Sequence, residues 1–143
     1  MKIRDVSIAV KDLDAAVEDM RHKFDLEPRY IQNDDRPPIQ VRAALYSLGT
    51  SGLSLMASSE DGSPIDRFLK RRGEGVFSIC VQVDDIKAAT ADMRSKGVEF
   101  VLDEPIVMND FMAHDGVYSA CHMNFTRPAS THGVVFEVQQ LDR

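Results

Sequence analysis

The sequence lacks an excess of positive charge and lacks long apolar runs, and each absence excludes a class of protein. Its 143 residues carry 17 lysines and arginines against 23 aspartates and glutamates, for a net charge of −6. Binding to a phosphate backbone needs a basic face, so no nucleic-acid partner is expected. No apolar run approaches the roughly 20 residues that a membrane-spanning helix needs. We therefore expect no membrane partner either.

Cysteine is also scarce, with Cys80 and Cys121 alone. The two thiols could pair in principle. The N-terminal stretch MKIRDVSIAV, however, is too short and too mixed in polarity for a signal peptide. Two thiols without secretory features are expected to stay free in a reducing compartment, so the sequence predicts a cytoplasmic protein.

The most informative feature that is present is an internal repeat. Residues 8–21, IAVKDLDAAVEDMR, recur 73 residues later as 81–94, VQVDDIKAATADMR, with seven of the fourteen positions identical. A sequence repeat usually indicates a structural repeat. Because the chain has the length of one domain, we predict a single domain, 1–143. This domain consists of module one (1–58), a linker (59–75) and module two (76–143).

Each module is predicted to have the order βαβββ, which makes the fold α+β. In module one we expect a strand over 1–10, a helix over 13–24 capped by Asp12, and strands over 26–32, 40–48 and 53–57. In module two we expect a strand over 76–83, a helix from Asp85 to about Lys96, and strands over 98–102, 118–126 and 134–138. A further helix is predicted over 65–72. Residues 104–116, EPIVMNDFMAHDG, are expected to form either a loop that covers a site or an ordinary surface loop.

Alternation along the strands predicts a polar face. Successive side chains point to opposite sides of a strand, so Ser78 and Cys80 share one side and the branched residues between them share the other. Asp5 in the first strand lies on the corresponding polar side, and so do Ser54 and Glu137 in the two closing strands. We expect this face to border a cleft, although a simple solvated sheet face has the same pattern.

Three segments resemble the vicinal oxygen chelate superfamily, the glyoxalase, bleomycin resistance and dioxygenase fold. They are IAVKDLDAAV, GEGVFSICVQVDDIKAA and RPASTHGVVFEVQQ. Within that superfamily they are most similar to methylmalonyl-CoA epimerase-like and lactoylglutathione lyase-like proteins. The resemblance implies two paired βαβββ modules that form a curved mixed sheet around a cleft, and it implies a homodimer.

The resemblance also implies a divalent metal, held by His, Gln or Glu, His and Glu. These four positions fall on Asp5, Ser54, Ser78 and Glu137, and only Glu137 matches. Because serine hydroxyls are poor neutral ligands for a transition metal, we expect no cofactor in the usual position. Asp5 and Glu137 could still hold a hard divalent cation weakly through oxygen.

The predicted activity is that of an isomerase or lyase that moves a proton next to a carbonyl of a small metabolite, with an acyl-CoA thioester as one candidate substrate. Two neighbouring carboxyl groups disfavour double ionisation, so Asp5 and Glu137 could act as base and acid. Ser54 and Ser78 could hydrogen-bond the substrate. The epimerases resemble one another in a glutamate beside the substrate, and Ala43 replaces it here. This replacement argues against the usual form of epimerisation.

Cys80, His114 and His122 complete the candidate substrate-binding residues. Cys80 faces the predicted cleft by alternation, and packing as a small residue suits it better than nucleophilic attack. His114 lies in the long connection and His122 at its far end, where either could be structural. Two rival functions stay open: a non-catalytic small-molecule-binding or resistance protein, and a metalloenzyme that uses displaced ligands such as these histidines.

Overall fold

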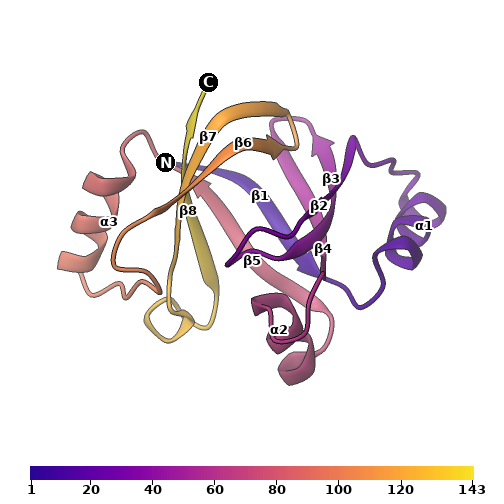
Figure 1. Cartoon of the computed structure of the whole chain (residues 1–143), viewed down its shortest axis with the longest axis horizontal. Coiled ribbons are helices and arrows are strands. Elements are labelled where there is room, and N and C mark those ends of the chain that lie inside the picture. Colours follow the sequence, from indigo (N-terminus) through magenta and orange to yellow (C-terminus); the bar gives the residue numbers. More distant parts are fainter. The chain divides into compact units, whose positions relative to one another are not determined.

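The computed structural model describes all 143 residues, Met1–Arg143 (Figure 1). The chain divides into two compact units. We call Val6–Phe77 the first unit, and Met1–Asp5 together with Ser78–Arg143 the second unit. No helix in the chain is both long and apolar enough to cross a membrane.

The first unit follows the order strand, helix, three strands, helix. Its elements are the end of β1 (Lys2–Ala9), α1 (Leu13–Phe24), β2 (Tyr30–Asp34), β3 (Val41–Leu48), β4 (Ser51–Ser58) and α2 (Pro64–Arg72). The strands lie in the order β2-β3-β4-β1, and β3 pairs antiparallel with both β2 and β4. Helix α1 contacts β3 and β4 (Figure 1).

Helix α1 forms where a cap and an apolar stripe coincide. The Asp12 side chain accepts a hydrogen bond from the backbone N–H of Ala15 at 3.0 Å, which satisfies a donor at the helix start. Leu13 and Val17 lie on one side of the helix and are buried, as their helical spacing requires. Asp25 ends the helix in the left-handed conformation, with φ of 54°. The core that α1 completes contains Val10, Leu13, Val17, Ala44, Tyr46, Leu55 and Ala57.

The second unit repeats the order of strand, helix and three strands. Its elements are β5 (Gly75–Gln82), α3 (Ile86–Ser95), β6 (Ile106–Ala113), β7 (Gly116–Phe125), a 3-10 turn (Pro128–Ser130) and β8 (Val135–Asp142). The strands lie in the order β5-β8-β7-β6, with β5 and β8 parallel and the other pairs antiparallel, so the sheet is mixed. Helix α3 contacts β8 (Figure 1) and completes a core of Val81, Val83, Ile86, Phe100 and Val138.

The α+β class and the two βαβββ modules are confirmed, and the bounds of α1 agree with the prediction. The expected loop over 104–116 is wrong, because β6 occupies Ile106–Ala113 and pairs with β7. The expected strand over 98–102 is also wrong, since that segment makes only an isolated bridge between Phe100 and Thr126. In each case a partner distant in the sequence decides the structure, β7 for the first segment and Thr126 for the second, and local sequence does not record it. Both cysteines are free and buried, as expected.

Candidate active site

One face of the second unit's sheet gathers the polar side chains that the sequence marks. Residues opposite each other on paired strands share a face of the sheet. Glu137 of β8 lies opposite Cys80 of the neighbouring strand β5 and opposite Phe125 of the other neighbour, β7. Gln82 lies opposite Gln139 in the same way. We call this side the Glu137 face. Its members are Ser78, Cys80, Gln82, Glu137, Gln139, Cys121, Met123 and Phe125.

Glu137 is the buried acid of this face, with only 8% of its surface exposed. Its Oε1 accepts a hydrogen bond from Gln139 Nε2 at 2.7 Å, and its Oε2 accepts one from Cys80 Sγ at 3.3 Å. Burial raises the pKa of Glu137, and the two hydrogen bonds oppose that rise only in part. The protonated form of this carboxyl is therefore favoured at a higher pH than in a solvated glutamate.

Buried side chains of low polarity surround Glu137 and explain why its pKa is raised. Met123 is 1% exposed and Cys121 is completely buried. Burial, followed by the nearby charge of Glu137, raises the pKa of the Cys121 thiol far above its usual range. A thiol with a raised pKa stays protonated, and a protonated thiol is not a nucleophile. Cys121 therefore contributes packing and low polarity to the site.

Two further oxygens on the Glu137 face have no partner within the protein. Ser78 is fully buried, and its Oγ makes no hydrogen bond. The Oε1 of Gln82 is likewise buried without a partner. Nearly all buried polar atoms in native structures are hydrogen-bonded. These two oxygens are therefore the groups of this face that are open to a ligand or a water molecule.

The structure places some of the residues that the sequence predicts on one face of the second unit's sheet. Ser78, Cys80 and Glu137 lie on one face, and half-buried Asp5 belongs to the same unit. Ser54 is buried in β4 of the first unit. Their roles as catalytic or substrate-binding residues stay predictions.

The two candidate histidines have different surroundings. His114 is buried in the turn between β6 and β7, next to Asp115. His122 lies opposite Gln140, on the other side of the sheet from Glu137, and its Nε2 lies 2.8 Å from Asp142. That ion pair gives His122 a structural partner away from the Glu137 face.

Sequence reasoning missed a partly buried ion pair between the start of β1 and the turn after β6. The Arg4 side chain is 6% exposed and donates two hydrogen bonds to Asp115, at 2.8 and 2.6 Å. The Tyr118 hydroxyl donates a third to Asp115 at 3.1 Å, and the Arg4 guanidinium carbon lies 5.7 Å from the Tyr118 ring centre. Hydrogen bonds from Arg4 hold the pKa of Asp115 well below its usual range. An arginine inside an alternating strand was the only signal for this pair. Gln82 and Gln139 lie on the polar side that strand alternation marks, but sequence reasoning did not select them as site residues.

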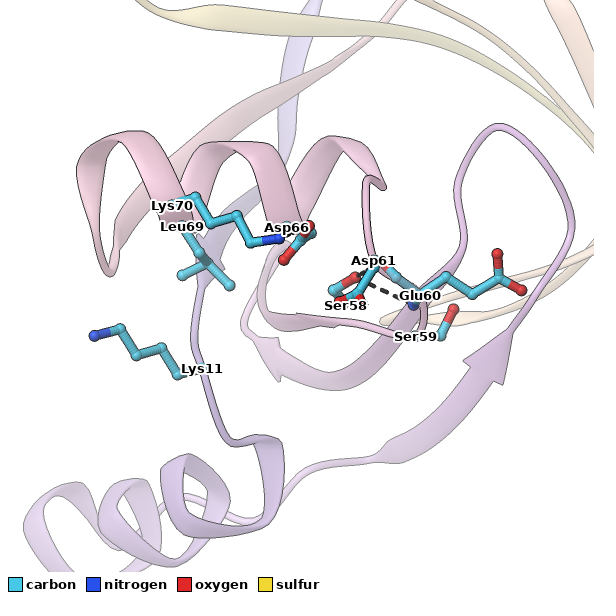
Figure 2. A pocket seen from close by; sticks show the side chains of 8 residues that line it. All are labelled: Lys11, Ser58, Ser59, Glu60, Asp61, Asp66, Leu69 and Lys70. Carbon is cyan, nitrogen blue, oxygen red and sulfur yellow. Dashed lines mark hydrogen bonds and ion pairs between the residues drawn. The ribbon is translucent and has the colours of Figure 1, made fainter.

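A separate cavity of about 630 Å³ opens in the first unit, beside α2 (Figure 2). Its lining residues are Lys11, Ser58, Ser59, Glu60, Asp61, Asp66, Leu69 and Lys70. Asp66 already pairs with Lys70 at 2.9 Å (Figure 2). It also accepts a hydrogen bond from the backbone N–H of Gly62. Charges of both signs therefore line an open hollow, and no single ligand chemistry is selected there.

Two βαβββ modules, with an acidic residue on the closing strand of one of them, define a class of fold rather than a reaction. The family model of the Glyoxalase/Bleomycin resistance protein/Dioxygenase superfamily matches residues 4–115, and the chain belongs to this superfamily. Its relatives are methylmalonyl-CoA epimerases. The ethylmalonyl-CoA/methylmalonyl-CoA epimerase of Cereibacter sphaeroides is 32% identical over 97 residues, which cover 67% of this chain and 71% of the relative.

Solved structures extend this similarity to the whole fold. A variant of Streptomyces coelicolor methylmalonyl-CoA epimerase in complex with 2-nitronate-propionyl-CoA is 29% identical, with a TM-score of 0.82 over 98% of this chain and 96% of that one. A methylmalonyl-CoA epimerase in complex with methylmalonyl-CoA and NH4+ is 30% identical, with a TM-score of 0.81 over 97% and 93% of the two chains. The predicted membership of the vicinal oxygen chelate superfamily is confirmed.

These relatives correct the expectation of no cofactor. The superfamily normally uses a divalent cation, and one solved relative holds the cation NH4+ together with methylmalonyl-CoA. The expectation considered only the side chains at Asp5, Ser54, Ser78 and Glu137. Backbone carbonyls, water and substrate oxygens also bind cations, so those four replacements do not decide whether a cation is bound.

The chain's own side chains fit a divalent cation poorly. No group of three or more histidine, cysteine, aspartate or glutamate side chains is placed to hold a metal ion. Both Glu137 oxygens already accept hydrogen bonds, and burial favours the protonated carboxyl. Ser78 offers only a neutral hydroxyl.

Proposed function

We propose that this protein is an isomerase that moves a proton next to the carbonyl of an acyl-CoA thioester, with Glu137 as the acid and base. The observation that carries the proposal is the buried Glu137 carboxyl, held by Gln139 and Cys80 at 2.7 and 3.3 Å. The similarity to methylmalonyl-CoA epimerases supports the substrate class.

The raised pKa of Glu137 suits both directions of the transfer. Ionised Glu137 takes the proton from the carbon next to the thioester carbonyl, and the electron pair of that C–H bond moves onto the carbonyl oxygen. A carboxylate whose pKa is raised is a stronger base than a solvated one. A second group, for which Asp5 is the candidate, delivers a proton to the opposite face of the same carbon, and the electron pair of the enolate forms the new C–H bond. In the reverse reaction the protonated Glu137 carboxyl returns its proton to its own face of that carbon.

The remaining predicted residues are proposed as supporting groups. Asp5, in the same unit as Glu137, is the candidate for a second proton-transfer group. Ser54, Ser78 and His114 are candidates for hydrogen bonds to the substrate. Cys80 acts through Glu137, because its thiol holds one oxygen of that carboxyl. His122 has the weakest support, because it lies on the opposite side of the sheet and pairs with Asp142.

The test is hydrogen exchange with solvent. Methylmalonyl-CoA is incubated with the protein in deuterated water containing a divalent cation, and deuterium next to the carbonyl is followed by mass spectrometry. The wild type is expected to catalyse uptake. Glu137→Gln preserves shape and is expected to slow uptake by about 10²-fold or more, the usual contribution of a general acid or base.

Glu99→Gln is the matched control, because Glu99 is an exposed glutamate of the same unit. This variant is expected to exchange at the wild-type rate. Exchange by Glu137→Gln at the wild-type rate would refute the role of Glu137. Binding of the thioester by the wild type without any exchange would instead identify a ligand-binding protein.

A further inference from the structure

The Glu137 face carries two unpartnered oxygens on one strand, and their chemistry differs. Ser78 Oγ and Gln82 Oε1 are both buried without a hydrogen bond inside the protein. They belong to β5, where Ser78, Cys80 and Gln82 occupy alternate positions and so point to the same side. A native protein leaves few such atoms without a partner.

The spacing of these oxygens brackets the acid. Ser78 and Gln82 are four residues apart, which is about 13 Å along a strand, and Cys80 lies midway between them. Cys80 is the ladder partner of Glu137 and donates a hydrogen bond to it. A ligand that lies along β5 with its reacting carbon at Glu137 therefore reaches Ser78 in one direction and Gln82 in the other. Each arm spans roughly 7 Å.

The two ends require different partners. A glutamine oxygen only accepts hydrogen bonds, whereas a serine hydroxyl both donates and accepts. The acyl end of a thioester offers oxygen acceptors and no N–H, so it matches Ser78 and cannot satisfy Gln82. The thiol arm of coenzyme A offers an amide N–H four bonds from the thioester carbon, on the order of 5 Å away when extended. That amide matches Gln82 in both chemistry and reach.

We propose that Gln82 is a specificity-determining residue that accepts a hydrogen bond from the first amide N–H of the coenzyme A arm, while Ser78 donates to the acyl group. This inference rests on the proposed function for the class of substrate. It adds the orientation of that substrate along β5 and a residue that distinguishes an amide-bearing thioester arm from other thioesters.

The test compares two unreactive thioethers that differ by one group. Each carries the same carboxyalkyl chain. One ends in N-acetylcysteamine, and the other has an ester oxygen in place of the amide N–H. Binding is measured by NMR titration, so no turnover is needed. The wild type is expected to bind the amide about tenfold more tightly than the ester, which corresponds to roughly 1.4 kcal/mol.

Variants of Gln82 test whether this residue causes the preference for the amide over the ester. Gln82→Met is expected to bind both thioethers equally, to within a factor of two, and Gln82→Glu is expected to keep the preference because it keeps an acceptor oxygen. Gln140→Met removes a glutamine from the opposite side of β8, where Gln140 Oε1 accepts the backbone N–H of Ile86. This control is expected to keep the wild-type ratio even if its melting temperature falls.

Two results would overturn the inference: a wild type without preference for the amide, or a tenfold preference that persists in Gln82→Met. Either outcome leaves the deuterium exchange by Glu137 untouched, since the exchange assay reports the acid and this titration reports the arm. Conversely, loss of exchange activity with an intact amide preference would refute the proposed reaction and retain the binding subsite.

Discussion

The two units share their scaffold and differ in the polar groups that they bury. Asp12 and Asp85 occupy equivalent positions of the repeat, and each caps its helix through the third residue along the chain at 3.0 Å. The closing strands differ, because β4 carries Ser54 where β8 carries Glu137. The repeat therefore preserves what folds each unit, and the acid with its donors occurs in the second unit alone.

The ion pairs of the two units show the same contrast. Arg21 pairs with Glu18 in the first unit, where the two side chains are 42% and 69% exposed. Arg4 pairs with Asp115 in the second unit, where the two side chains are 6% and 33% exposed. Exposed pairs contribute little to stability, whereas the charge-assisted hydrogen bonds of a partly buried pair contribute more. The second unit is therefore the more sensitive to loss of a charge.

The largest expected effect comes from breaking the Arg4–Asp115 pair. Arg4→Met removes three of the polar contacts around Asp115 and Tyr118 and leaves Asp115 with the tyrosine hydroxyl alone. The free energy of unfolding is expected to fall by about 2 kcal/mol, measured by urea denaturation, because the lost hydrogen bonds join two charged groups while Asp115 stays partly solvated. Arg21→Met in the first unit is the control and is expected to change it little. Equal losses in the two variants would remove the contrast between the units.

A change of pH is expected to have an intermediate effect on the free energy of unfolding. Comparison with Glu137→Gln assigns this effect to Glu137. Burial raises the folded-state pKa of Glu137 above its ordinary value of 4.5. The folded state therefore binds this proton more tightly than the unfolded state. Its contribution to stability is complete below pH 4.5 and is lost as the pH rises from there through the folded-state pKa.

Glu137→Gln has no proton to lose at this position. Compared with the wild type, its free energy of unfolding is expected to gain up to about 1.4 kcal/mol per pH unit over that interval. Urea titrations of both proteins between pH 4 and 8 measure the difference. A constant difference across the whole range would show that Glu137 ionises like a solvated carboxyl. Asp115 titrates in the opposite sense, since its pKa is lowered, so its contribution is lost only in acid.

Local signals in the sequence were enough for the helices and for the polar face. The cap at Asp12 and the spacing of Leu13 and Val17 specify α1 without reference to the rest of the chain. Alternation alone placed Ser78 and Cys80 on the side that later proved to hold Glu137. Both features repeat within a few residues, which is why a sequence records them.

Long-range pairing was not recorded in the same way. The alternation of β6 is interrupted at Asp110, which has a left-handed φ of 51°, so the segment resembles a loop until β7 pairs with it. Arg4 and Asp115 are 111 residues apart, and neither has a local feature that identifies the other. The Glu137 environment likewise depends on Gln139 and Cys80 reaching the same carboxyl, which only the strand register establishes.

The smallest expected effect tests the shared part of the comparison. Asp12→Ala and Asp85→Ala each remove one capping hydrogen bond of 3.0 Å, and the two caps have nearly the same backbone geometry, with φ of −130° and −136°. Each variant is expected to lose about 1 kcal/mol of unfolding free energy in urea, the usual value for an aspartate cap. The double variant is expected to lose the sum, because the two caps share no partner. A loss at Asp85 several times that at Asp12 would mean that the second unit controls global unfolding, and that the scaffold is equivalent in geometry but not in energy.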